Sequence, residues 1–185
     1  DLEKVKPAFQ DLLDRMRTDY IDLGMIHFVD EAAEFQSIMN GEFMKYVRGL
    51  KEQGIIRHIG MSTHNPAVAK MGALCGEIEM ILFSINPAFD MLPASENIED
   101  YFKERYEEEL GGIAPERAEL YRICEQEEVG ITVMKGYAGG RLFSAEASPF
   151  GVALTPVQCL HYALTRPAVA SIMVGYDTPD HVAAA

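Results

Sequence analysis

Short apolar runs alternate with amphipathic stretches along most of the chain. Apolar side chains recur at a helical period within residues 1–17, and a compact apolar run, YIDLGMIHF, follows at residues 20–28. The same alternation then repeats down the chain. Further helices are predicted at residues 35–51, 66–74, 116–127 and 155–164, and further strands at residues 55–63 and 79–85 and within residues 130–142 and 170–182.

Five strand–helix repeats predict an α/β fold with parallel strands and right-handed crossovers. Both a doubly wound sheet and a TIM-type (β/α)8 barrel fit the pattern. No GxGxxG follows the first strand, which weakens the dinucleotide-fold version. Polar and glycine residues gather in the loops after the strands rather than before them. This predicts a site at the carboxyl ends of the strands, as in a barrel.

Residues 88–116 interrupt the repeat. They contain Pro93, an acidic stretch at residues 96–109, and the pair Gly111-Gly112. We expect a solvated, partly helical insertion within one domain that covers residues 1–185. A loop that covers the substrate is the functional alternative.

Composition narrows the classes of partner. The chain has 185 residues, 48% of them hydrophobic, and a net charge of −13, which argues against nucleic acid as a partner. No apolar run is long enough for a membrane span. Three scattered cysteines match no zinc pattern and predict reduced thiols, hence a cytoplasmic protein. The start at Asp1 and the end at Ala185 lead us to expect a piece of a longer chain.

The clearest candidate for chemistry is His27, at the end of the first predicted strand. A histidine at a barrel mouth can polarise a carbonyl group or transfer a proton near neutral pH. A packed histidine bonded to the backbone is the structural alternative.

A run of small and polar side chains follows the second strand. Ser62 and Thr63 could hold an amide-bearing ligand at the barrel mouth. Capping of the next helix is the competing explanation, and it accounts well for Asn65 ahead of Pro66.

The loops after the fourth and fifth strands carry glycines and two cations. Gly139, Gly140 and Gly175 would let backbone amides approach a phosphate, and Arg141 would add positive charge. Glycine pairs are also common in turns. Lys135 ends the fourth strand, where it could form a Schiff base or serve as a charged rim residue.

Taken in order, these segments resemble the aldo-keto reductase family. TDYIDLGMIH looks like the family's fourth barrel strand, GIIRHIGMSTHN like the fifth, EMILFSINP like the sixth, GITVMKGYAGGRL like the seventh and SIMVGYDTPDHV like the eighth. The resemblance therefore implies a partial barrel with strands four to eight. It also places His27 at the family's catalytic histidine. The family's catalytic aspartate, tyrosine and lysine lie on earlier strands.

The resemblance also implies a cofactor, NADP or NAD. Ser62 and Thr63 match the residues that hold the nicotinamide carboxamide, although asparagine is usual in place of Thr63. Asp177 stands where NADP-preferring members often have a basic residue. Phe83 or Ser84 stands near the place of the usual glutamine. The implied cofactor-binding residues are Ser62, Thr63, Met134, Lys135, Gly139, Gly140, Arg141 and Gly175, with Met134 in place of a stacking tyrosine.

The function implied is NAD(P)-dependent reduction of a small carbonyl compound or oxidation of an alcohol. A non-catalytic nucleotide-binding or scaffolding domain is the alternative, and an aldolase that uses Lys135 is a third. The segment TPVQCLHYALTRPAVASIMVG is similar to members with a ferredoxin-like iron–sulfur extension, whose cysteines would lie beyond residue 185. Five strands of an open barrel leave two apolar edges, so we expect a homo-oligomer that covers them.

Overall fold

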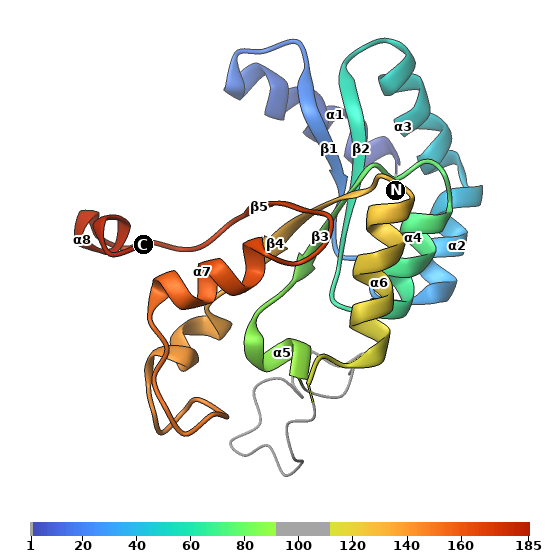
Figure 1. Ribbon diagram of the computed structural model, residues 1–185. Helices are drawn as coiled ribbons and strands as arrows, with labels where there is room; N and C mark the ends of the chain where they lie inside the picture. The colour runs from blue at the N-terminus through green and yellow to red at the C-terminus, as the bar shows by residue number, and fades with distance from the viewer. Residues whose placement is uncertain (1, 92–111) are drawn as a thin grey trace.

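The computed structural model describes residues 2–91 and 112–185 (Figure 1). The helices are α1 (Leu2–Met16), α2 (Ala32–Asn40), α3 (Glu42–Glu52), α4 (Pro66–Leu74), α5 (Pro87–Met91), α6 (Pro115–Gln126), the 3₁₀ helix η2 (Ala138–Phe143), α7 (Pro156–Leu164) and α8 (Pro179–Ala183). The strands are β1 (Ile21–Ile26), β2 (Ile56–Thr63), β3 (Met80–Ser84), β4 (Gly130–Met134) and β5 (Val169–Ile172).

The five strands form one parallel sheet in the order β1-β2-β3-β4-β5. A doubly wound sheet reverses its strand order at a switch point, whereas a barrel adds strands in sequence. The sequential order therefore decides between the two predicted folds, and the partial-barrel prediction is confirmed. Within the described residues, β1 and β5 each pair with a strand on one side only.

Alternate strand positions build the main core. The register aligns Ile26 with Met61, Met61 with Ile81, and Ile81 with Ile131, and all four side chains are buried. Because neighbouring residues of a strand face opposite sides, this row lies on one face of the sheet. Helices α2, α3, α4 and α6 stack on that face (Figure 1).

A second cluster of buried side chains joins α5, η2 and α7, and it consists of Ala88, Phe89, Ala138, Leu142 and Cys159. In Figure 1 these helices lie beside the β3–β5 part of the sheet, apart from α2 and α4. This cluster supports the chain segment that follows β4.

A buried polar hub built on Asp90 ties these helices together. Its Oδ1 accepts from the Tyr121 hydroxyl at 2.5 Å and from Arg117 at 3.3 Å, and its Oδ2 accepts from the Tyr162 hydroxyl at 2.9 Å. Arg117 also donates to the backbone carbonyl of Ser84. Burial raises the pKa of Asp90, against the pull of Arg117 and the two tyrosines. The hub therefore compensates by hydrogen bonds for a carboxyl group taken fully out of water.

Two sequence predictions need correction. The helix predicted at residues 35–51 is two helices, because Gly41 is extended, with φ −95° and ψ 177°. The predicted insertion at residues 88–116 does not begin as a solvated segment, since Ala88, Phe89 and Asp90 of α5 are fully buried. Residues 92–111 of that insertion lie outside the described residues.

The helix starts predicted at residues 66 and 155 are confirmed. The Asn65 side chain accepts from the backbone N–H of Ala67, and Thr155 forms a capping box with Gln158. Thr178 caps α8 in the same way. Among the described residues, we find no helix with the length and apolar character that a membrane crossing requires.

Candidate functional site

The candidate residues gather at the carboxyl ends of the strands. His27 directly follows β1, Ser62 and Thr63 end β2, and Lys135 directly follows β4. Gly175 lies three residues after the end of β5. Because the strands are parallel, these ends share one edge of the sheet, which is the face where barrel enzymes hold their chemistry.

His27 is exposed to solvent at that edge. The next residue, Phe28, has a left-handed backbone, with φ +61°, and its N–H donates to Ser62 Oγ at 2.7 Å. This bond fixes the turn that presents the histidine. An exposed imidazole in this place can meet a carbonyl oxygen, so the packed-histidine alternative does not describe it.

Ser62 and Thr63 are buried, with 3% and 0% of their surface exposed. Ser62 Oγ accepts from Phe28 N–H, and Thr63 Oγ1 donates to an Asp30 carboxylate oxygen at 3.0 Å. Thr63 Oγ1 also accepts from Asn65 N–H. Both side chains therefore join the loops after β1 and β2, and of the two only the Ser62 hydroxyl proton has no assigned acceptor in the described part of the chain.

An Asp30–His64 pair, which the sequence did not reveal, holds the same two loops. Asp30 Oδ1 accepts from His64 N–H at 2.7 Å, and Oδ2 lies 2.9 Å from His64 Nδ1. Burial pushes the pKa of Asp30 up, but the hydrogen bonds from His64 and Thr63 outweigh it and hold the pKa below its usual value. The carboxylate is therefore charged at neutral pH, deep in the candidate site.

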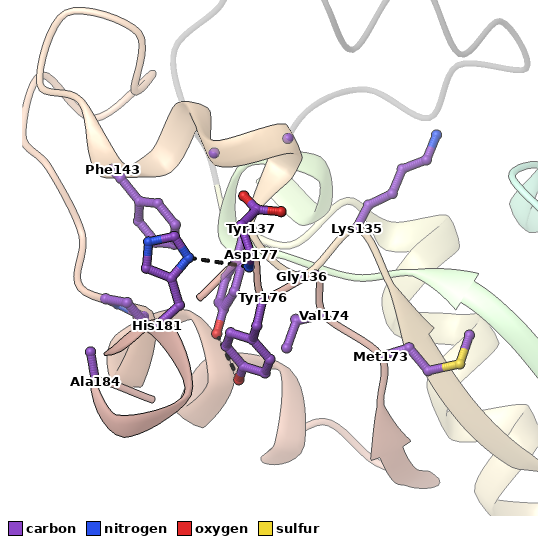
Figure 2. Close-up of a pocket in the computed structure, with 14 residues that line it drawn as sticks. Lys135, Gly136, Tyr137, Phe143, Met173, Val174, Tyr176, Asp177, His181 and Ala184 are labelled. Carbon is purple, nitrogen blue, oxygen red and sulfur yellow. Dashed lines mark hydrogen bonds between the residues drawn. The ribbon is translucent and has the colours of Figure 1, made fainter. Parts of the chain in front are cut away.

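Burial and the nearby Asp30 carboxylate both act on the pKa of the Lys135 ammonium group. Burial lowers its pKa, while the charge of Asp30 acts in the opposite direction. Lys135 has a left-handed backbone, with φ +57°, and Asn86 donates to its carbonyl at 2.9 Å. In Figure 2 its side chain points away from the tyrosines that line the nearby cavity.

A cavity of about 590 Å³ opens between the loops that follow β4 and β5 (Figure 2). Its volume falls in the usual range for small-molecule sites. The lining residues are Lys135, Gly136, Tyr137, Gly139, Gly140, Phe143, Pro156, Met173, Val174, Gly175, Tyr176, Asp177, His181 and Ala184. Four of the eight residues that the sequence assigned to a cofactor line this cavity, namely Lys135, Gly139, Gly140 and Gly175. Ser62, Thr63, Met134 and Arg141 are not among the lining residues.

Glycine has a specific role on one wall of the cavity. Gly139 and Gly140 have φ of +66° and +85°, a conformation that side chains disfavour, and a Cβ on either would meet open space. Gly175 also faces open space. The backbone on this wall is therefore accessible to a ligand.

Aromatic rings form another wall. The hydroxyls of Tyr137 and Tyr176 lie 3.3 Å apart, and the ring centroids of Tyr137 and Phe143 lie 4.9 Å apart. Burial and the neighbouring Tyr176 raise the pKa of Tyr137, so the phenol stays neutral. Tyr137 and Tyr176 lie 39 residues apart in the chain, so no local sequence pattern predicts that their rings form one wall. The one signal in the sequence is that each tyrosine stands beside a glycine.

Comparison with known proteins decides the family. The model of the aldo/keto reductase family matches residues 2–153. The chain belongs to the aldo/keto reductase family. It is 33% identical over 76 residues to methylglyoxal reductase DkgB of Salmonella typhi, a match that covers 38% of this chain and 27% of the relative. The relative of the same name from Escherichia coli O157:H7 matches to the same extent.

Solved aldo-keto reductases share the fold. The holo form of aldo-keto reductase AKR11C1 from Bacillus halodurans superposes with a TM-score of 0.66 at 22% identity, over 97% of this chain and 59% of that protein. Its apo form gives a TM-score of 0.64 over 60% of its length. The chain therefore spans less than two thirds of the relatives that it matches.

Two positions of the site differ from the family pattern described above. Phe83 is fully buried in the main core, and Ser84 is 2% exposed beneath α6. Neither presents an amide at the barrel mouth, where the aldo-keto reductase pattern has glutamine. Met134, in the place of the stacking tyrosine, is only partly buried at the end of β4.

Proposed function

We propose that the chain forms the nucleotide-binding side of an aldo-keto reductase, which transfers hydride between a nicotinamide nucleotide and a small carbonyl compound or alcohol. The observation that carries the proposal is the convergence of Lys135, Gly139, Gly140 and Gly175 on one cavity. The same residues match the family's cofactor-binding positions by their order in the chain.

The cavity fits NADP or NAD by three of its properties. Its volume of about 590 Å³ accepts a large part of a dinucleotide. The open backbone at Gly139 and Gly140 lets amide groups approach phosphate oxygens. The aromatic wall of Tyr137, Phe143 and Tyr176 offers faces on which an adenine ring can stack. A bound nicotinamide nucleotide would supply the hydride.

His27 would orient and polarise the substrate carbonyl at the carboxyl end of β1. Its exposure allows this contact, and the Phe28–Ser62 hydrogen bond fixes the turn that presents it. In the family pattern, the acid tyrosine lies on an earlier strand than the five that match here. General acid catalysis contributes roughly 100- to 10,000-fold in rate, so we expect little turnover from these 185 residues alone.

The relatives named methylglyoxal reductase suggest a first substrate. Methylglyoxal is a small dicarbonyl compound, and it serves as the probe for the carbonyl class. A His27→Gln variant should bind the nucleotide as the wild type does and lose any reduction of methylglyoxal that the protein shows.

Direct titration of the protein with NADH tests the proposal. A leucine at Gly175 projects into open cavity space, and because this position has no left-handed backbone, the change adds volume without strain. We expect Gly175→Leu to weaken NADH binding at least about tenfold, which corresponds to about 1.4 kcal/mol. Gly49→Leu is the matched control, since Gly49 lies in α3 with only a 3.8 Å contact to the Gln53 amide nitrogen.

If NADH binds both variants with the affinity of the wild type, or does not bind the wild type, the cavity is not the cofactor site. Calorimetry suits this measurement because the chain contains no tryptophan to report binding by fluorescence.

A non-catalytic nucleotide-binding domain is the second candidate. The burial of Phe83 and Ser84 and the presence of Met134 favour it, because two contacts typical of the family's nicotinamide end, those of the glutamine and of the stacking tyrosine, are altered. NADH binding without any methylglyoxal-dependent NADH oxidation, unchanged by His27→Gln, would support this candidate over the enzyme.

Two further parts of the proposal concern assembly and location. In the part of the chain that the structure describes, β1 and β5 each have one side without a neighbouring strand, and Leu23 and Met173 near these sides are about half exposed. These features favour a homo-oligomer or another covering segment. A single monomeric species with a cooperative melt in analytical ultracentrifugation and calorimetry would contradict it. The three cysteines are free, which favours the cytoplasm. Kinship with iron–sulfur members stays a prediction.

A further inference from the structure

We infer that the cavity between the β4 and β5 loops selects a dinucleotide with a free ribose 2′-hydroxyl, so that the protein takes NAD(H) in preference to NADP(H). The inference rests on the proposed function and specifies which nicotinamide nucleotide the site accepts. It follows from the distribution of charge around the cavity.

Three lining residues have side chains that can carry a charge near neutral pH, and these are Lys135, Asp177 and His181. Lys135 lies at the strand end, and its side chain points away from Tyr137 and Tyr176 (Figure 2). Its charge also interacts with Asp30 on the far side. The positive charge of Lys135 therefore lies at the strand end of the cavity, away from the aromatic wall.

His181 accepts a hydrogen bond at the aromatic wall. The backbone N–H of Asp177 donates to His181 Nδ1 at 3.3 Å, as the dashed line in Figure 2 marks. Among the described residues that line the cavity, Asp177 is the one that carries a carboxylate.

The Asp177 carboxylate interacts favourably with NAD(H) and unfavourably with NADP(H). Asp177 directly follows Tyr176, so an adenosine stacked on the aromatic wall places its ribose near the carboxylate. A ribose 2′-hydroxyl can donate a hydrogen bond to a carboxylate, as acidic residues do for NAD in other nucleotide folds. A 2′-phosphate brings a charge of about −1.5 to −2 and can only accept there, so it is repelled.

The solvent exposure of Asp177 limits the size of the preference for NADH over NADPH. Asp177 is exposed, and like charges in such a place are partly screened by water and salt. We therefore expect a preference of about tenfold for NADH over NADPH at low ionic strength, which shrinks as salt is added.

Calorimetric titration with NADH and NADPH tests the inference on the wild type and on two variants. Asp177→Asn removes the charge and keeps the shape, and it should reduce the preference at least threefold, mainly by tighter NADPH binding. Asp180→Asn is the control, because Asp180 lies three residues further along the chain in α8, carries the same charge and is not among the cavity-lining residues. It should leave the preference unchanged.

The outcomes separate the inference from the proposed function. Equal or tighter binding of NADPH by the wild type overturns the NAD(H) preference and leaves the nucleotide site standing. A preference for NADH that Asp177→Asn and Asp180→Asn alter equally also overturns it, because the effect is then one of net charge. Absence of binding of both nucleotides overturns the proposed function itself.

Discussion

The Asp90 hub makes a strong prediction about stability. Replacement of Asp90 by alanine removes the acceptor of the Tyr121 and Tyr162 hydroxyls and of the Arg117 guanidinium, all within α6 and α7. The carboxyl group and Arg117 are both 0% exposed. Three lost hydrogen bonds at about 1 kcal/mol each, with the cost of leaving buried donors behind, give a loss of about 3–5 kcal/mol.

Urea unfolding followed by circular dichroism measures this loss. The matched control is Glu119→Ala, which removes a surface ion pair with Lys70 at 3.0 Å, where both side chains are more than a third exposed. That change should cost at most about 1 kcal/mol. If Asp90→Ala leaves the protein unable to fold, Tyr162→Phe, which removes one hydrogen bond, should still cost about 1 kcal/mol.

A loss from Asp90→Ala no larger than that from Glu119→Ala would refute the reasoning, because the hub would then add nothing beyond a surface contact. A functional consequence follows as well. The hub supports the α5–η2–α7 cluster that carries the cofactor loop, so a destabilised but folded Tyr162→Phe variant should bind NADH more weakly.

Two further predictions concern charged groups at opposite ends of the sheet. Glu79 is desolvated, which raises its pKa, but hydrogen bonds from Lys51 and His58 bring the pKa down to about 2 from 4.5. Its stabilising effect is full above pH 4.5 and is lost as the pH falls toward 2. Because the Glu79 side chain is 38% exposed, we reduce the expected contribution to about 1 kcal/mol of unfolding free energy. Glu79→Gln should therefore remove about 1 kcal/mol of the stability that the wild type loses between pH 4.5 and 2, as measured by the melting temperature at each pH. Asp30→Ala removes the acceptor for His64 and should cost about 2–3 kcal/mol in the same urea assay, and a cost below about 0.5 kcal/mol would contradict the bonding described.

Local signals in the sequence predicted most of the fold. Short apolar runs gave the five strands, and Asn65 and Thr155 marked helix starts correctly, because a cap depends on residues within one turn. The break at Gly41 was missed, since the apolar period of α2 runs on into α3. The strand–helix repeat alone fits both a barrel and a doubly wound sheet; the family resemblance implied the barrel, and the strand order confirms it.

Local sequence patterns also predicted part of the candidate site. The positions of His27 and Gly175 follow from strand ends, which local patterns locate. The Asp30–His64 pair joins residues 34 apart in the chain, so no local pattern reveals it. Ser62 and Thr63 were predicted to face a ligand, yet their burial depends on how two loops pack together.

The most direct test of the account is the structure of the protein in complex with NADH. The account predicts the adenosine against Tyr137 and Tyr176, the phosphates along the backbone of Gly139 and Gly140, and the ribose near Asp177. A dinucleotide bound away from the cavity between the β4 and β5 loops would contradict the central claim.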